Sequence, residues 1–346
     1  MINSPDLHAS RSLLADWIEL LALLRERPAG VGDLDSLYRL NSDGDRQRRV
    51  LGDGLAEEEI IETEREDLSG RVAEEIAFRA KALGEGYPFE VRAAPFQIST
   101  KSDVSTPARS AYVFMLLMSG YTFGLFNKNG TVNAAIDAGR RLFHLCASFG
   151  VAGLLRHGRT HWFGFPRPDK SNFAAALDAL AKEIGYAAAH VPAPAGLPEK
   201  AKDDQVDVLG WREFGDRRIG TMFVVCQAAT GADWDSKSVL NHLDAFLDWF
   251  ERAPYRVAMP SLAVPFLGHH EVTEPGSDAP FETATFNALR RLHGRHGVIL
   301  DRLRITESIP ALMEDAGAAG RVAGHADVGN LHAWVQTFRP MILATA

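Results

Sequence analysis

The segment 206–229 constrains the fold of this chain more than any other part of the sequence. It reads VDVLGWREFGDRRIGTMFVVCQAA, in which two apolar runs flank a polar turn that contains glycine. Apolar runs of this length separated by turn residues predict a β-hairpin. The first run carries one carboxylate, Asp207, between two valines, and the second run ends near Gln227.

Two interpretations of Asp207 are open from the residues alone. A carboxylate in an apolar strand is costly to bury unless it binds a metal ion or accepts hydrogen bonds. In the first interpretation Asp207 and Gln227 are ligands of a divalent cation, Mg²⁺ or Mn²⁺, which prefers oxygen ligands. In the second interpretation the two side chains satisfy backbone or turn groups.

The flanks of the hairpin predict a mixed α/β arrangement. Apolar residues with a 3.6-residue period predict helices over 172–184 and 238–252, and the segments 256–266 and 298–305 read as further strands. The predicted order is helix, strand, strand, helix, strand. Helical patterns dominate the preceding part of the chain, over 12–27, 57–83, 110–126 and 134–149, with a polar connection over 28–54. We therefore expect a mostly helical domain over residues 1–165 and an α/β domain over residues 166–346.

The hairpin and its flanks resemble the PD-(D/E)XK nuclease superfamily, and in particular the Mrr-type restriction endonucleases, whose second strand carries Gln-x-Lys. Further segments resemble a group of bacterial proteins that we associate with this superfamily and to which no activity is attached. These segments are VDVLGW at 206–211, QAATG at 227–231, WDSK at 234–237 and DRLR at 301–304. The resemblance implies a restriction-endonuclease-like mixed sheet flanked by helices. It also implies a Mg²⁺-dependent endodeoxyribonuclease that acts on DNA, in the context of bacterial defence against foreign DNA.

The chain departs from the pattern of that superfamily at one important position. The resemblance implies a lysine two residues after Gln227, where this chain has Ala229. In this chemistry an ammonium group near the scissile phosphate offsets developing negative charge. Lys237 is the candidate for a displaced catalytic cation, although a solvated lysine fits its position equally well. Glu183 and Asp178 are candidates for a further carboxylate ligand, although an exposed position on the helix fits each of them better.

A second function is consistent with the same departures. The missing lysine and the unassigned third carboxylate also fit a catalytically degenerate nuclease fold, which would serve as a nucleic-acid- or protein-binding scaffold in a defence complex. The net charge of −8 argues against coating nucleic acid by bulk electrostatics, and it agrees with other protein subunits as partners. Local basic groups remain compatible with a nuclease.

The segment 156–170, RHGRTHWFGFPRPDK, is the best candidate for contact with a polyanion. Basic residues alternate there with aromatic ones, a pattern that suits phosphate contacts combined with base stacking. Arg159, Arg167 and Lys170 are the candidate phosphate contacts. An equally good interpretation is a junction between domains, in which the arginines pair with the acidic helix at 57–67.

The remaining sequence narrows the class of protein. Cys146 and Cys226 lie in apolar surroundings, which predicts buried thiols in a reducing cytoplasm. The first ten residues lack the features of a signal peptide. The uncharged stretch 110–126 is too short and too polar for a typical membrane span, so we expect a buried helix. The sequence contains no Walker loop and no GxGxxG motif, so we expect no nucleotide cofactor.

Overall fold

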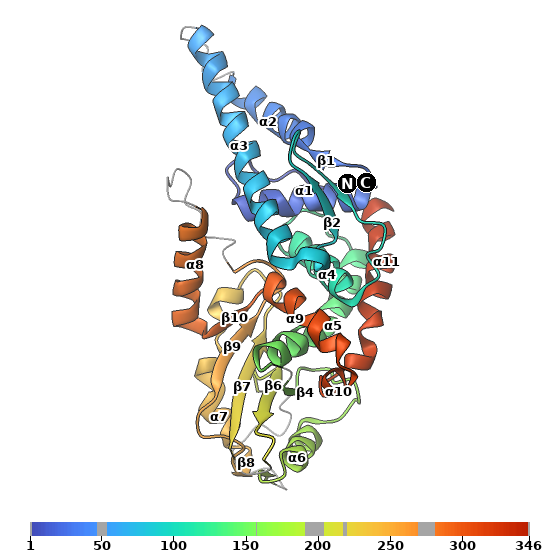
Figure 1. Ribbon diagram of the computed structural model, residues 1–346, viewed down its shortest axis with the longest axis vertical. Coiled ribbons are helices and arrows are strands. Elements are labelled where there is room, and N and C mark those ends of the chain that lie inside the picture. The colour runs from blue at the N-terminus through green and yellow to red at the C-terminus, as the bar shows by residue number, and fades with distance from the viewer. Residues whose placement is uncertain are drawn as a thin grey trace.

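The computed structural model describes residues 2–46, 54–156, 158–190, 204–216, 220–268 and 281–344. It shows a mixed α/β protein with a five-stranded sheet at one end and a largely helical amino-terminal region at the other (Figure 1). Both of these broad features agree with the sequence analysis.

The predicted hairpin forms the centre of the main sheet. The strands of this sheet are β4 (Arg159–Trp162), β6 (Val208–Glu213), β7 (Thr221–Ala228), β9 (Met259–Ala263) and β10 (Val298–Leu300). They lie in the order β10-β9-β7-β6-β4, and β6 and β7 form the hairpin. Strands β7, β9 and β10 are parallel, whereas β6 runs antiparallel to both of its neighbours. The hairpin register pairs Val208 with Cys226.

Helices cover both faces of this sheet. Helix α5 (Gly130–Leu154) lies across β4, β6 and β7. It approaches β6 closely because Gly210 has no side chain, and a Cβ atom there would lie 2.2 Å from Val151. The opposite face packs against α6 (Phe173–Ile184) and α7 (Leu243–Leu247) through a cluster rich in aromatic residues.

The amino-terminal region consists mainly of four helices. They are α1 (Arg11–Arg25), α2 (Val31–Arg46), α3 (Gly54–Leu83) and α4 (Pro107–Thr122). A small sheet of β1 (Ala29–Gly30), β2 (Phe89–Arg92) and β3 (Gln97–Thr100), not predicted from the sequence, packs beside α1. The carboxy-terminal helix α11 (Gly329–Ala344) returns to pack on α4 (Figure 1).

The shorter elements complete the chain. They are η1 (Gly84–Gly86), β5 (Ala188–Ala189), η2 (Trp234–Ser236), η3 (Val239–His242), β8 (Phe250–Arg252), α8 (Phe281–His296), α9 (Arg302–Glu314), α10 (Ala316–Ala319) and η4 (His325–Asp327). One hydrophobic core includes Leu14, Val208 and Leu300, so it draws on both sides of residue 165. Strand β4 also precedes that residue, and the division into two domains remains a prediction.

Three predicted segments differ in the structure. The helix expected over 238–252 is divided into η3, α7 and β8, because Phe250 continues as a strand that pairs with β5. The strand expected over 298–305 ends at Leu300, because the Asp301 side chain caps α9 by accepting a hydrogen bond from the Arg304 amide. The connection expected over 28–54 contains α2.

The uncharged stretch 110–126 forms most of α4, which is buried as expected. Among the helices that the structure describes, none has the length and apolar character needed to cross a membrane.

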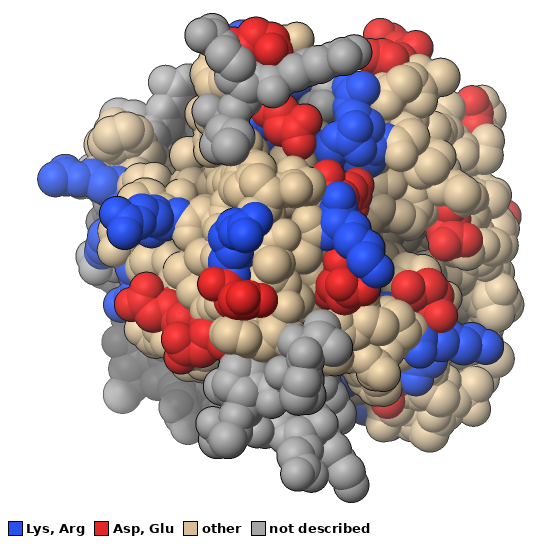
Figure 2. Space-filling view, turned by 90° about the horizontal axis from the view of Figure 1, so that it is seen from below, with Lys and Arg blue, Asp and Glu red and all other residues tan. Residues whose placement is uncertain are grey.

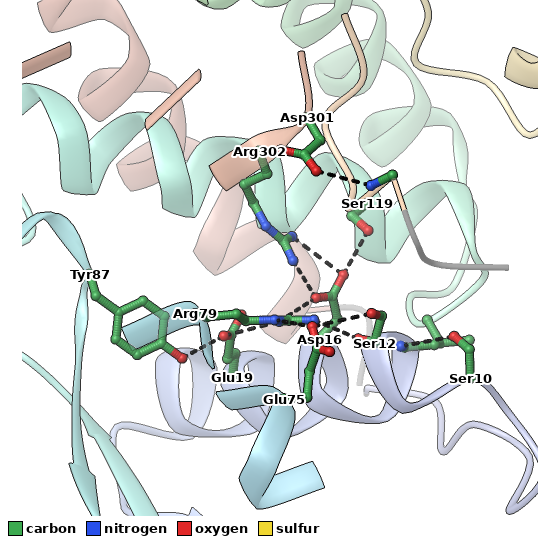
Figure 3. Close-up of polar contacts among 12 residues, drawn as sticks. Ser10, Ser12, Asp16, Glu19, Glu75, Arg79, Tyr87, Ser119, Asp301 and Arg302 are labelled. Atoms are coloured by element: carbon green, nitrogen blue, oxygen red, sulfur yellow. Dashed lines mark hydrogen bonds and ion pairs between the residues drawn. The ribbon is translucent and has the colours of Figure 1, made fainter. Parts of the chain in front are cut away.

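A cluster of buried charges joins α1, α3 and α9 (Figure 3). The Arg79 guanidinium lies 2.7 Å from the Asp16 carboxylate and 2.8 Å from that of Glu75, and Arg302 also pairs with Asp16. Burial alone would raise the pKa of Asp16, but pairing with Arg302 and Arg79 outweighs it and lowers that pKa. The carboxylate of Asp16 is therefore ionised, and its contribution to stability is lost only in strong acid.

Replacing Arg79 with methionine should lower the free energy of unfolding strongly. The substitution leaves buried carboxylates without their main partner, a loss that costs about 3–5 kcal/mol of unfolding free energy. Arg65→Met on the same helix is the matched control, because Arg65 forms partly exposed pairs with Asp35 and Glu62 that contribute at most about 1 kcal/mol. Urea denaturation measures both variants. Equal losses would show that the buried cluster is not a major source of stability.

Candidate functional site

Asp207 lies immediately before β6 and is buried, with 8% of its surface exposed. Its Oδ2 atom accepts a hydrogen bond from the backbone N–H of Ala228 at 2.7 Å. Its Oδ1 atom lies 3.1 Å from Nε2 of His144, on α5. The carboxylate thus takes the place of a backbone acceptor where the hairpin ladder ends, as the second interpretation of the sequence expected.

The His144 ring is held between two acceptors. Its Nδ1 atom lies 3.2 Å from the carbonyl oxygen of Arg141, and its Nε2 atom faces Asp207. A ring that carries its proton on Nε2 donates a hydrogen bond to the Asp207 carboxylate, which accepts it. Gly164 makes room for the pair, because a Cβ atom there would lie 2.4 Å from the imidazole and 2.9 Å from Oδ1 of Asp207.

Sequence reasoning missed His144. The residue lies in a helix assigned to the amino-terminal region, 63 positions before Asp207. The sequence feature that could have indicated it is a lone histidine between Phe143 and Leu145 in an otherwise apolar stretch. A polar ring on the buried side of a helix indicates a buried partner.

Gln227 lies on β7, beside the Asp207 strand. Along β7, Cys226 packs into the core on the α5 side, so the alternation of a strand directs Gln227 to the opposite face. Its amide nitrogen donates to the side-chain oxygen of Gln205 at 3.0 Å. Its own Oε1 atom is buried and, within the described part of the chain, lacks a hydrogen-bond partner.

The thiol of Cys226 is not a candidate nucleophile. Burial raises its pKa to about 12. Cys146 is also a free, buried cysteine, as the sequence predicted. Both thiols are therefore packing groups.

Lys237, the candidate for a displaced catalytic cation, lies beside a surface carboxylate. Lys237 directly follows η2, and its Nζ atom lies 3.6 Å from Oδ1 of Asp233, an exposed side chain. Ala229, at the position where the resemblance implies lysine, is fully buried, and its N–H donates to the carbonyl of Ala263. The contacts of Lys237 are those of a solvated surface lysine, and they do not support its role as a displaced catalytic cation.

The two candidate carboxylates on α6 are engaged at the surface. Glu183 lies 3.5 Å from Arg159 and 3.5 Å from His161, and Asp178 pairs with Lys182 at 2.6 Å. Within the described ranges, no group of three or more His, Cys, Asp or Glu side chains is placed to hold a metal ion.

These residues fit a divalent cation poorly. Mg²⁺ takes near-octahedral oxygen coordination, and both carboxylate oxygens of Asp207 already lie against hydrogen-bonding partners. The orphaned Oε1 atom of Gln227 is the one feature of the pair that favours a missing ligand.

The candidate phosphate contacts differ in exposure. Arg167 is 4% exposed, its Nη1 donates to the carbonyl of Ser171, and its guanidinium lies over the Phe173 ring. That burial leaves Arg167 no surface to offer to a nucleic acid. Lys170 is exposed, whereas Arg159 is half-buried and shares the carboxylate of Glu183.

Comparisons with known proteins add no assignment. No protein-family model matches the chain. Neither the curated proteins nor the solved structures give a significant match.

Asp207→Ala should lower the unfolding free energy by about 2–3 kcal/mol, since hydrogen bonds to a charged acceptor contribute about 1.5–3 kcal/mol. In a double-mutant cycle with His144→Ala, we expect a coupling of about 0.5–3 kcal/mol. Asp178→Ala, which removes an exposed carboxylate, is the control and should cost less than about 0.5 kcal/mol. If Asp207→Ala is no more harmful than this control in urea denaturation, Asp207 is not a structural acceptor.

Proposed function

We propose that the sheet and its helices are a restriction-endonuclease-like core. The order α5, β4, β6, β7, α7, β9 gives the helix, three strands, helix, strand succession of that core, and the sheet order β4-β6-β7-β9 supports the same reading. The sequence assigned the first helix to 172–184. In this proposal α5 has that place, and α6 is an insertion between β4 and β6.

The function that the geometry supports best is that of a catalytically degenerate nuclease fold, which acts as a scaffold for nucleic acid or protein. The observation that carries this proposal is the engagement of Asp207 by the Ala228 amide and His144. The burial of Ala229 where a catalytic lysine belongs supports it further. Its place in a bacterial defence complex rests on the sequence resemblance, and a net charge of −8 is compatible with protein subunits as partners.

A Mg²⁺-dependent endodeoxyribonuclease is the second candidate. One observation favours it, namely that the buried Oε1 atom of Gln227 lacks a partner within the described residues. A cation bound there would satisfy that oxygen. Because Asp207 faces His144 of α5, away from Gln227, it would have to reorient its side chain and exchange its present hydrogen bonds for a metal bond.

Titration calorimetry with Mn²⁺ separates the two candidates. The scaffold predicts that the wild-type protein gives no binding heat and that linear and plasmid DNA stay intact in Mg²⁺ or Mn²⁺. A nuclease predicts binding heat and cleavage that both disappear in Asp207→Asn, a variant whose folding is checked by circular dichroism. Metal-dependent cleavage that Asp207→Asn abolishes would overturn the scaffold.

Lys237→Ala should change the unfolding free energy by no more than about 0.5 kcal/mol, as expected for a partly exposed surface side chain. It should also leave the response of the protein to DNA and Mn²⁺ unchanged. Loss of a transition-state contact would instead reduce a cleavage rate roughly a hundred- to thousand-fold. Cleavage by the wild type that falls this far in Lys237→Ala would restore the displaced-lysine mechanism.

A further inference from the structure

A groove lined by arginines lies at the turn end of the hairpin, at the opposite end of β6 from Asp207. Its volume is about 410 Å³. The lining residues that matter here are Arg156, Arg159, Arg212, Glu213, Phe214 and Arg321. Four arginines and one glutamate make this surface positive, although the whole chain is acidic.

A second hollow of about 780 Å³ lies beside the carboxyl end of α5. Arg156 lines both hollows, and Arg304, His293 and Ser308 extend the polar lining beyond it. The second hollow also includes Glu307, so the charge is concentrated on the Arg156 side.

Much of the positive charge in the groove is not neutralised. In the described part of the chain, neither Arg156 nor Arg321 has a carboxylate within ion-pair distance, and Arg159 shares Glu183 at 3.5 Å. The carboxylate of Glu213 accepts a hydrogen bond from the indole nitrogen of Trp211 at 3.3 Å. The groove therefore presents guanidinium groups that are available to an anion.

Packing of the fold explains only part of this arrangement. The carboxyl end of a helix attracts cations, and Arg212 serves that purpose by donating to the carbonyl of Leu155 at 3.3 Å. Arg156 has a φ of +47°, a left-handed conformation that favours glycine at a helix end. The fold does not require an arginine at this position, so the charge of Arg156 needs another explanation.

An exposed aromatic ring completes the site. Phe214 lines the groove with 72% of its surface exposed. Arginines that contact phosphates next to an exposed ring that stacks on bases are the combination used for single-stranded nucleic acids. In a duplex the faces of the bases are stacked on one another, so they are not free to stack on Phe214. An acidic peptide has no bases that could stack on this ring.

We propose that this groove binds single-stranded nucleic acid, with phosphates on Arg156 and Arg321 and a base stacked on Phe214. The proposal deepens the scaffold function and rests on it for the binding role, but it uses none of the residues around Asp207. On the end of the molecule shown in Figure 2, basic and acidic side chains are interspersed. Attraction is thus local to the groove and sensitive to salt.

Fluorescence anisotropy with a labelled single strand of about 20 nucleotides tests the groove, because sites of this kind cover about 4–16 nucleotides. The combined Arg156→Gly and Arg321→Gln variant should bind at least about tenfold more weakly than the wild type. The slope of log affinity against log salt concentration should become shallower by about 0.7 for each phosphate contact that is lost. Arg140→Gln, in the first half of α5 and away from the groove, is the matched control and should bind like the wild type. Arg156→Gly suits the left-handed backbone, so thermal unfolding should show no loss of stability.

Phe214→Ala tests the stacking. It should weaken binding of the single strand roughly 5- to 150-fold, while binding of inorganic polyphosphate stays unchanged. Wild-type protein that does not bind the single strand at low salt, or a double-arginine variant that binds it as well as the wild type, would overturn the proposal. Tighter binding of polyglutamate or of a DNA duplex would overturn it as well.

The proposed function fails in a different experiment. Metal-dependent cleavage that is lost in Asp207→Asn would overturn the proposal of a degenerate nuclease site, but it would not affect the proposal that the arginine groove binds a single strand. Absence of single-strand binding would overturn the proposal for the groove. The proposed scaffold would then be a scaffold for protein.

Discussion

Five charged side chains buried between distant helices set the constraint on which the rest of the structure depends. They are Asp16, Glu19, Glu75, Arg79 and Arg302, and none is more than 1% exposed. The hydroxyl group of Tyr87 donates a hydrogen bond to Glu19 (Figure 3), and so does that of Tyr112. Charges are buried at an acceptable cost only when all are paired, which leaves α1, α3 and α9 few alternative arrangements. Because α9 begins two residues after β10 ends, the cluster also fixes the amino-terminal helices against the sheet.

The same principle governs the hairpin on a smaller scale. Asp207 is buried where the backbone ladder stops, and its carboxylate accepts from the Ala228 amide and faces His144 of α5. A carboxylate committed to these contacts stabilises the joint between helix and sheet. Asp207 would have to give up these hydrogen bonds before it could bind a metal ion. This energetic cost is the physical reason to favour a binding role over catalysis.

Local patterns predicted the local elements. The alternation and turn residues of 206–229 gave the hairpin, and the 3.6-residue period gave α1, α5 and α6 within a few residues of their ends. Contacts between distant segments were not predictable in this way, since Asp16 meets Arg302 across 286 positions. The burial of Arg167 depends on Phe173 and its surroundings, which a list of basic residues cannot reveal. The hydrogen bonds that occupy Asp207 likewise depend on tertiary packing.

A crystal structure of the protein grown in Mn²⁺ tests the central claim most directly, because anomalous scattering locates the ion independently of any activity. The account predicts no anomalous peak beside Asp207, with the Ala228 amide still within hydrogen-bond distance of its carboxylate. A peak bound by Asp207 and by Oε1 of Gln227, with the contact to Ala228 broken, would contradict it.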